Sequence, residues 1–225
     1  MKTISIAIDG PSGAGKSTLA RSIAAKLGYL YVDTGAIYRT IGYHALSAGI
    51  DPKDEAAVSA ALPELHVELT YGEDGLQHML LNGEDVTGAI RENQVSRWAS
   101  QVSAIPGVRA FLLEMQRDLA RRHSVIMDGR DIGTVVLPQA DLKIFLTASV
   151  EQRAIRRCKE LEEKGQSVPL ETVKAEIAQR DYDDSHRAAA PLRQAEDAVV
   201  VDTSQLNLEE SLEALYTLVK ERLQL

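Results

Sequence analysis

The run GPSGAGKST at positions 10–18 constrains the fold of this 225-residue chain more than any other feature. Two glycines bracket four residues and are followed by Lys and Ser, which is the pattern of a phosphate-binding loop. A β-branched run at 3–8 predicts a strand before the loop, and helical spacing of apolar residues over 17–27 predicts a helix after it, ending at Gly28. This context favours an α/β protein with a parallel sheet.

Each part of the loop has a physical role toward a bound triphosphate. Glycines let several backbone N–H groups converge on one point, and the helix that follows adds its positive N-terminal end. Lys16 is expected to reach the β and γ phosphates, and the Ser17 hydroxyl is placed to ligate Mg²⁺. The candidate nucleotide-binding residues of the loop are Gly10, Pro11, Ser12, Gly13, Ala14, Gly15, Lys16, Ser17 and Thr18.

The segment 30–91 first continues the strand-and-helix alternation and then breaks it. A second strand over 30–32 ends at Asp-Thr-Gly, and a helix is expected over 36–48. Val67, Leu69 and Tyr71 alternate, 77–81 is expected to be another strand, and Asn82-Gly83 is a strong hairpin signal before 84–86. We therefore expect a small antiparallel sheet inserted into the α/β core.

The alternation resumes in the second half of the chain. A helical pattern over 94–122 is interrupted near Pro106-Gly107, and strands are expected over 124–127 and 142–146. A charged helical hairpin over 151–190, a final buried strand over 198–201 and an amphipathic helix over 208–223 follow. These patterns predict a three-layer core with a five-stranded parallel sheet, an acceptor-binding insert with the antiparallel sheet, and a helical lid. The expected division is 1–35 with 92–150 and 191–225 for the core, 36–91 for the insert and 151–190 for the lid.

Composition excludes several classes of protein. No apolar run approaches the ~20 residues that cross a bilayer, and the first residues are not typical of a signal peptide because Asp9 interrupts their apolar stretch. One cysteine excludes an internal disulfide, and a net charge of −8 disfavours polymeric nucleic acid as a partner. We expect a cytoplasmic protein. Since 16 of the 25 basic residues are arginine, a local anion site is expected, although about half of the arginines could lie on solvated helices.

A phosphate loop alone leaves the reaction open. The Asn-Lys-x-Asp guanine motif of GTPases is absent, and the third core strand ends in Asp128-Gly129 where motor ATPases usually have Asp-Glu. A small transferase fits better, since an insert can hold an acceptor and an arginine-rich hairpin can close as a lid.

Four motifs together resemble the bacterial cytidylate kinases, a family of nucleoside monophosphate kinases. They are GPSGAGKST, YVDTGAIYR at 31–39, MDGRDIGTVV at 127–136 and RDYDDSHRAAAPL at 180–192. The resemblance runs from end to end and includes the inserted sheet. It implies a monomeric, Mg²⁺-dependent enzyme that transfers the γ-phosphoryl group of ATP to CMP or dCMP, with no membrane or nucleic-acid partner.

The second and third motifs give acceptor-site candidates. Thr34 could cap the next helix and Arg39 could be an ordinary surface arginine, but the resemblance places both in the CMP site and Arg39 on the CMP phosphate. Arg130 and Asp131 could form a structural ion pair, whereas the resemblance implies that Arg130 holds the CMP phosphate and Asp131 accepts from the cytosine amino group. Ser17 is expected to ligate Mg²⁺ directly, with Asp33 and Asp128 acting through water.

The remaining candidates lie on helical segments where the local pattern is uninformative. Ser100 and Arg109 match the family pattern and are expected at the cytosine ring. Residues 180, 184 and 187 share a helix face, which could be merely solvated; the resemblance implies that Arg180 and Asp184 bind the ribose and Arg187 the phosphates. Arg153, Arg156 and Arg157 are expected on the lid, with Arg156 and Arg157 binding ATP. Lys16, Arg130 and Arg187 are the expected catalytic residues.

Two alternatives remain open at this point. One is a kinase for another small acceptor, such as UMP, AMP or shikimate. The other is a nucleotide-gated switch, which the insert and the arginine-rich hairpin disfavour. The preference between CMP and dCMP is not predicted.

Overall fold

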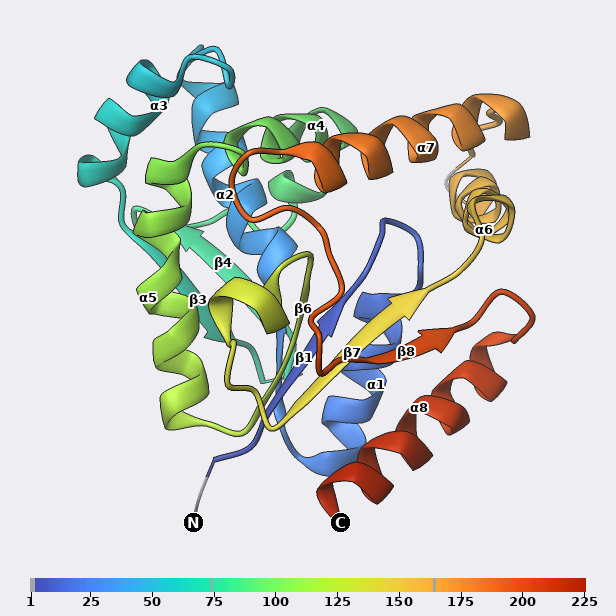
Figure 1. The fold of residues 1–225 in the computed structure, drawn as a ribbon. Helices are drawn as coiled ribbons and strands as arrows, with labels where there is room; N and C mark the ends of the chain where they lie inside the picture. Colours follow the sequence, from blue (N-terminus) through green and yellow to red (C-terminus); the bar gives the residue numbers. More distant parts are fainter. Residues whose placement is uncertain (1–2, 74, 164) are drawn as a thin grey trace. The chain divides into compact units, whose positions relative to one another are not determined.

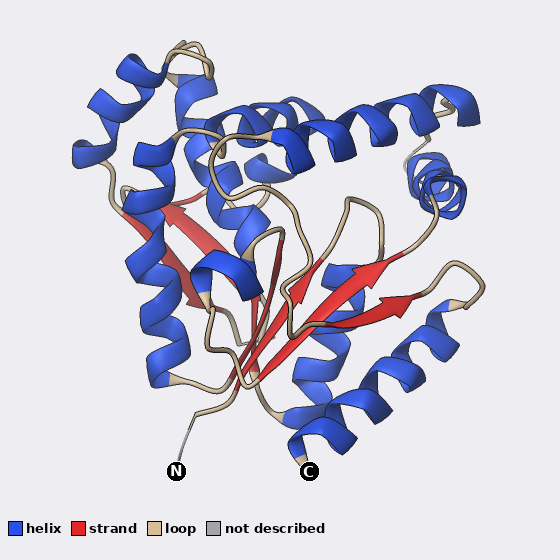
Figure 2. Cartoon of the chain, in the orientation of Figure 1, coloured by secondary structure: helices blue, strands red, loops and turns tan. Residues whose placement is uncertain are grey.

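The computed structural model describes residues 3–73, 75–163 and 165–225. The chain forms two compact units, Met1–Tyr31 with His123–Leu225, and Val32–Arg122. Each unit is built around its own sheet (Figures 1 and 2). The division into core, insert and lid stays a prediction about function.

The five-stranded parallel sheet confirms the predicted α/β class. Its strand order is β2-β6-β1-β7-β8, and Ile6 of the central strand lies between Ile126 and Leu142 in parallel register. Because β1 is flanked on both sides, it reads as a nearly unbroken apolar run. The strands are β1 Ser5–Asp9, β2 Leu30–Asp33, β6 Val125–Gly129, β7 Leu142–Thr147 and β8 Val199–Asp202.

Helices α1 (Lys16–Leu27) and α8 (Leu208–Leu223) contact each other and pack on the first unit's sheet (Figure 1). Leu215 and Val219 of α8 are fully buried there, which confirms the predicted apolar face. Local sequence fixes the helix ends: Gly28 ends α1 in the left-handed conformation, and Asn207 begins α8 with a capping box.

The final strand is present as predicted, but the prediction that it is buried is wrong. Strand β8 is present, but its residues alternate between half-buried and exposed, and Val200 is 49% exposed. The reason is topological: β8 is an edge strand with one neighbour, β7, and a run of valines does not distinguish an edge strand from a central one.

The helical hairpin is confirmed as α6 (Val150–Glu163) and α7 (Leu170–His186). The two helices share a small apolar cluster of Ala154, Leu161, Val173 and Ile177. None of the helices in the described parts of the chain is both long and apolar enough to cross a bilayer.

The second unit contains the inserted sheet, in order β3-β4-β5, as predicted. Asn82 and Gly83 both have positive φ, 52° and 84°, which matches the tight turn that Asn-Gly favours. Gly42 of α2 allows a close approach to α4, since a Cβ there would lie 2.7 Å from the Ala99 nitrogen. The elements are α2 Thr34–Ser47, α3 Glu55–Ala61, β3 Val67–Tyr71, β4 Gln77–Leu81, β5 Glu84–Asp85, α4 Asn93–Val102 and α5 Pro106–Arg122, with short 3-10 turns at Leu62–Glu64 (η1) and Ala89–Arg91 (η2).

Two details of this unit differ from expectation. The break in the long helical pattern falls at 103–105, just before Pro106, because proline is well suited to the first position of a new helix. Helix α3 was not predicted, since its seven residues are too few to show a clear period.

Candidate active site

The phosphate loop links β1 to α1, and its conformation requires glycine. Gly10, Gly13 and Gly15 have φ values of 151°, 76° and 90°. At Gly10 a Cβ atom would lie 1.9 Å from the Leu146 carbonyl oxygen, so no other residue fits. The loop is therefore held against β7 by its own backbone, at the carboxyl edge of the parallel sheet, where α/β proteins bind ligands.

Lys16 begins α1 and is only 5% exposed. Its Nζ donates a hydrogen bond of 2.7 Å to the Pro11 carbonyl, which curls the side chain back over the loop. Burial, and secondarily the positive charge of Arg130, lower the pKa of Lys16 to about 7. A polyphosphate bound at the loop would reverse this effect, because an anion favours the charged ammonium.

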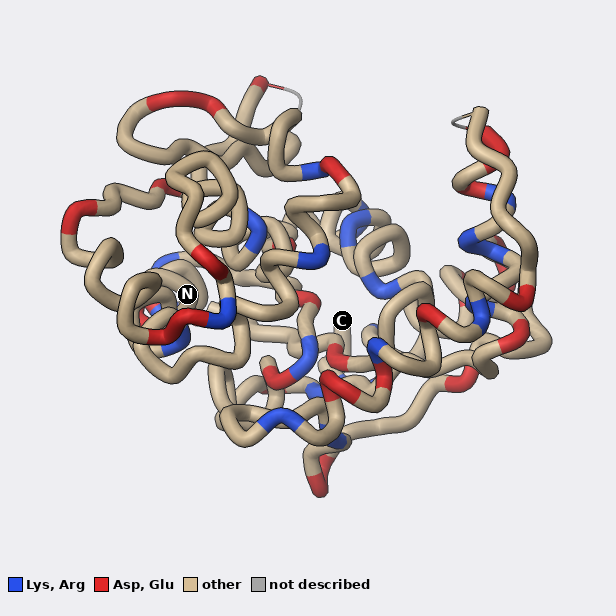
Figure 3. Tube along the Cα trace, turned by 90° about the horizontal axis from the view of Figure 1, so that it is seen from above, with Lys and Arg blue, Asp and Glu red and all other residues tan. Residues whose placement is uncertain are grey.

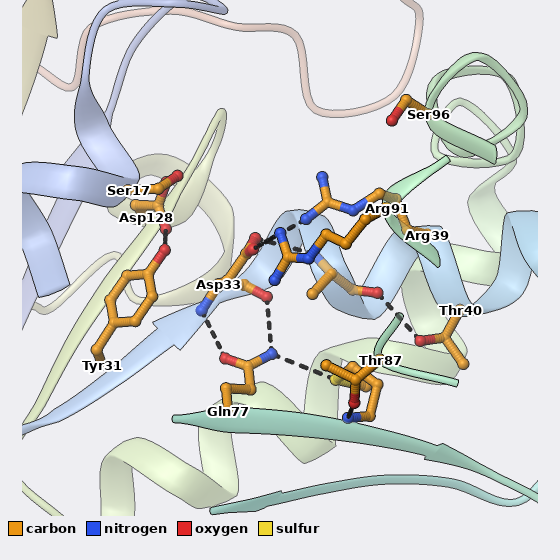
Figure 4. A network of polar contacts seen from close by, with 12 residues as sticks. Ser17, Tyr31, Asp33, Arg39, Thr40, Gln77, Thr87, Arg91, Ser96 and Asp128 are labelled. Atoms are coloured by element: carbon orange, nitrogen blue, oxygen red, sulfur yellow. Dashed lines mark hydrogen bonds and ion pairs between the residues drawn. The ribbon is translucent and has the colours of Figure 1, made fainter. Parts of the chain in front are cut away.

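Asp128, at the end of β6, lies beside the first turn of α1 (Figure 4). The Ser17 hydroxyl donates to Asp128 Oδ2 at 2.9 Å, and the Tyr31 hydroxyl donates to Asp128 Oδ1 at 2.8 Å. A hydroxyl and a carboxylate oxygen are thus adjacent at the loop. Tyr31 was not predicted to take part, because its residue type does not reveal which carboxylate it reaches.

Asp9, the last residue of β1, was also missed. Its carboxylate accepts the backbone N–H groups of Ile132 and Gly133 at 2.8 and 2.7 Å, at the start of the π-helical turn Ile132–Val136. Burial raises the pKa of Asp9 to about 6, although both hydrogen bonds oppose the rise. Asp9 therefore fixes the backbone that directly follows the predicted base-recognition residue Asp131.

Four predicted acceptor residues come together in the first unit as two ion pairs. Arg130 Nε lies 2.7 Å from Asp184 Oδ2, and an Arg187 nitrogen lies 3.2 Å from Asp131 Oδ1. Burial opposes ionisation of Asp184, but Arg130, helped by Arg180 and Arg187, lowers its pKa. Arg130 therefore forms an ion pair with a carboxylate, which was the alternative interpretation. The partner is Asp184, not Asp131.

The prediction that Arg187 shares a helix face with 180 and 184 is wrong. Helix α7 ends at His186, and Arg187 has an extended backbone with ψ of 143°. Its Nε donates to the Ala190 carbonyl at 2.7 Å, which turns the chain away from the helix. The side chain still reaches Asp131, but from the loop after α7.

The three arginines of α6 have different environments. Arg153 is 3% exposed, pairs with Asp181 and donates to the Ser12 carbonyl of the phosphate loop. Arg156 donates to the Thr203 carbonyl at 2.7 Å after β8, and the exposed contact of Arg157 is Glu160. Arg153 thus connects α6, α7 and the loop, while the ATP-binding roles of Arg156 and Arg157 stay predictions.

In the second unit, Asp33 organises the start of α2 (Figure 4). It is Asp33, not Thr34, that caps the helix, since its Oδ1 accepts the Ala36 N–H at 2.9 Å. Its Oδ2 lies 2.9 Å from Arg39 and 3.0 Å from Arg91. Burial opposes ionisation, but Arg39 and then Arg91 outweigh it and lower the pKa of Asp33. These partners occupy the carboxylate, and its role toward metal stays a prediction.

Gln77 of β4 clamps the backbone of Asp33. The Asp33 N–H donates to Gln77 Oε1 at 2.8 Å, and Gln77 Nε2 donates to the Asp33 carbonyl at 3.1 Å. The glutamine is 8% exposed. Neither Gln77 nor Arg91 was predicted, because both meet Asp33 across more than 40 residues of sequence.

Ser100 and Arg109 belong to one small network at the junction of α4 and α5. Arg109 donates to the Ser103 carbonyl at 3.0 Å, and the Ser103 hydroxyl donates to the Ser100 carbonyl at 2.8 Å. The Arg109 guanidinium also lies 5.3 Å from the centre of the Tyr38 ring, on α2. Arg109 is thus linked to the Ser100 backbone through Ser103, and the cytosine-binding roles of Ser100 and Arg109 stay predictions.

Basic and acidic residues alternate along the same segments of the chain (Figure 3). On α5, for example, Arg121 lies 3.3 Å from both Glu114 and Asp118, and Arg122 pairs with Asp118. These exposed pairs confirm that part of the arginine content serves solvated helix faces.

Comparisons with solved structures show the fold. An uncharacterised protein from Eubacterium ventriosum has a TM-score of 0.54 at 9% identity, covering 97% of this chain and 99% of its own. A shikimate kinase from Bacteroides thetaiotaomicron has a TM-score of 0.50 at 16% identity, covering 99% of both chains.

Sequence comparison is more specific. The model of the cytidylate kinase family matches residues 6–221. Cytidylate kinases of Streptococcus pneumoniae, from strains 70585 and Hungary19A-6, are each 49% identical over 223 residues, which is 99% of this chain and 100% of each relative. The phosphate loop has the glycine conformations that its shape requires, and the Asp128 carboxylate lies beside its serine. Together with the match over nearly the whole length, this shows that the chain belongs to the cytidylate kinase family.

Proposed function

We propose that this enzyme transfers the γ-phosphoryl group of ATP to the phosphate of CMP or dCMP, giving ADP and CDP or dCDP. Membership of the cytidylate kinase family carries the reaction and its substrate class. The phosphate loop with buried Lys16 supports the donor side, and the arginine-carboxylate clusters support the acceptor side.

The donor triphosphate would bind the backbone N–H groups of the loop at 10–18. Lys16 would leave the Pro11 carbonyl and donate to the β and γ phosphates, since a triphosphate is a far stronger acceptor than a neutral carbonyl. Arg156 and Arg157 are proposed to bind ATP from α6.

The donor set around Ser17 fits Mg²⁺. The Ser17 hydroxyl and Asp128 are hard oxygen donors 2.9 Å apart, and the described residues contain no cluster of three or more side chains able to cage a metal. This is typical of Mg²⁺, which keeps waters and phosphate ligands and takes few protein ligands. Ser17 would bind the ion directly, with Asp33 and Asp128 acting through water. When bound, Mg²⁺ neutralises charge on the β and γ phosphates.

The acceptor nucleotide has three parts, and we assign residues to each. Arg39, Arg130 and Arg187 are proposed at its phosphate, Arg180 and Asp184 at the ribose, and Ser100, Arg109 and Asp131 at the cytosine. Thr34 is proposed in the CMP site without assignment to one of these parts. Asp131 suits the base because its carboxylate is fixed by Arg187 and by the Asp9-held backbone that follows.

The transfer itself needs alignment and charge neutralisation more than proton chemistry. An oxygen of the CMP phosphate forms a bond to the γ phosphorus, the bond from that phosphorus to the bridging oxygen breaks, and ADP leaves with the electron pair. The attacking oxygen is already anionic, so no general base is required. Lys16, Arg130 and Arg187 would stabilise charge on the transferring group. Closure of the α6–α7 hairpin would exclude water. A cytoplasmic, monomeric enzyme stays our prediction.

A coupled assay of ADP release over a panel of acceptors tests this function. We expect rapid ADP release with CMP and dCMP, and far slower release with UMP, AMP and shikimate. Slow ADP release that is indifferent to every acceptor would instead indicate a nucleotide-gated switch. A preference for another acceptor would show that the cytosine assignments are wrong.

A further inference from the structure

Asp33 is a meeting point of three elements in the second unit, and two of them, β4 and η2, come from the part of the insert that follows α2 (Figure 4). Arg39 reaches it from α2, Arg91 from η2 and Gln77 from β4. The insert therefore contributes both a cation and a backbone clamp to the start of α2.

The two arginines share a single carboxylate oxygen of Asp33, at 2.9 and 3.0 Å. Two guanidinium groups on one carboxylate leave an excess of positive charge, which favours an additional anion. The Nε of Arg39 is buried and has no hydrogen-bond partner among the described residues, and the side chain of Arg91 is 53% exposed. The cluster thus retains donor capacity on both arginines.

Gly35 keeps space open at the same place. A Cβ atom there would lie 3.1 Å from Asp33 Oδ1 and 3.3 Å from an Arg39 terminal nitrogen. Gly35 has no positive φ, so backbone conformation does not require glycine there. The lack of a side chain is explained by the room that the carboxylate and the guanidinium need.

A purely structural role for Arg91 explains less. Asp33 is already paired with Arg39 and bonded to the Ala36 N–H, and the bond from an exposed arginine adds little stability. The Arg91 guanidinium does add a second planar set of N–H donors at the same point, and such donors bind the oxygens of a phosphate.

We infer that Arg91 is a second arginine that binds the phosphate of the acceptor nucleotide beside Arg39, and that Gln77 is a positioning residue for this pair. The inference rests on the proposed function. It assigns the inserted sheet a role in binding: Gln77 fixes the Asp33 backbone, and Asp33 fixes both guanidinium groups.

Arg91→Ala tests the phosphate contact, with Arg97→Ala, an exposed arginine on α4, as the matched control. We expect the KM for CMP to rise roughly 10- to 100-fold, as for loss of a charge-assisted hydrogen bond, with an unchanged KM for ATP. Cytidine, which lacks the phosphate, should inhibit the variant and the wild type equally. Arg91→Lys should be intermediate, because lysine keeps the charge but not the fork.

The outcomes separate the two proposals. An unchanged KM for CMP in active Arg91→Ala would overturn the inference and leave Arg91 a structural partner of Asp33. A weaker inhibition by cytidine would also overturn it, because the site as a whole would then be distorted. Failure of the wild type to phosphorylate CMP would instead refute the proposed function.

Gln77→Leu tests the positioning role, with the buried Gln116→Leu of α5 as the control. We expect a severalfold rise in the KM for CMP and unchanged inhibition by cytidine. Gln77→Glu keeps an acceptor for the Asp33 N–H but replaces the donor to the Asp33 carbonyl by an oxygen that repels it, so the rise in the KM for CMP should be at least as large. If neither variant alters the KM for CMP, the positioning role is wrong.

Discussion

Asp9 and Asp33 occupy equivalent places in two different regions and have opposite electrostatics. Each is buried and ends a strand, and at the start of a helical turn Asp9 accepts two backbone N–H groups and Asp33 accepts that of Ala36. Burial raises the pKa of Asp9 to about 6. In Asp33 the same effect is outweighed by Arg39 and Arg91, and its pKa is lowered.

The difference shows what keeps a buried carboxylate ionised in this molecule. Two good backbone hydrogen bonds do not offset the loss of solvent around Asp9, whereas two adjacent guanidinium groups do so for Asp33. Asp33 therefore keeps its charge at neutral pH and can hold arginines in place, whereas the pKa of Asp9 lies at about 6, near the lower end of the physiological range.

The largest effect on turnover is expected at Lys16, whose positive charge acts on Asp9. Lys16→Met should lower turnover by roughly 10³-fold or more, because the donor phosphates lose their mobile charge. The fold should survive, since burial already disfavours the charged lysine. Coupled ADP release and thermal melting check this, with exposed Lys53→Met as the control. Normal turnover would exclude Lys16 from the reaction.

Asp33→Asn should be the most destabilising of the carboxylate changes. Removing one partner of a buried ion cluster costs about 3–5 kcal/mol, and the arginines would lose their fixed orientation, raising the KM for CMP. A lowered pKa means that this stability is present above the unfolded-state pKa of about 4 and is lost as the pH falls through the folded-state pKa. Urea unfolding at pH 7.5 measures it. If Asp33→Asn lowered the free energy of unfolding less than Asp9→Asn does, the expected order of the two carboxylates would be wrong.

Asp131→Asn should alter base preference more than affinity for ATP. The proposed acceptor for the cytosine amino group would lose its charge while its shape is kept, which corresponds to about 1–3 kcal/mol in discrimination. Relative kcat/KM for CMP, UMP and AMP provides the measurement. Base preference identical to that of the wild type would remove Asp131 from the recognition of cytosine.

Asp9→Asn should have the smallest effect on stability, and the effect should depend on pH. A raised folded-state pKa means that the folded protein takes up the proton first, so stability from Asp9 increases as the pH falls from about 6 toward the unfolded value of 3.8. On going from pH 7.5 to pH 5, the free energy of unfolding of the wild type should rise by about 1 kcal/mol relative to that of the variant. The charges that act on Asp9 are those of Asp131 and Lys16, and Lys143 packs against Gly133 beside it. Parallel stability curves for the two proteins would show that Asp9 does not titrate in this range.

Much of the fold was predictable from sequence because its signals are local. The loop at 10–18, the Asn82-Gly83 turn and the apolar face of α8 depend on neighbouring residues and regular spacing. The strand at 199–202 was placed correctly, but its exposure depends on which strands flank it. Local sequence does not contain that information.

The candidate site divides in the same way. Lys16, Ser17 and Arg39 lie in recognisable motifs, whereas Gln77 and Arg91 reach Asp33 only because the inserted sheet folds back on the start of α2. Arg187 shows the converse error: helical spacing placed it on α7, but its backbone leaves the helix and the side chain reaches Asp131 from a loop.

A titration of the Asp carboxyl carbons by NMR, assigned with the Asp9→Asn and Asp33→Asn variants, measures the contrast most directly. We predict that Asp9 titrates near pH 6 and that Asp33 titrates below the ordinary carboxyl value of 3.8. A transition of Asp33 at or above that of Asp9 would contradict the account, because Arg39 and Arg91 would then not hold its charge.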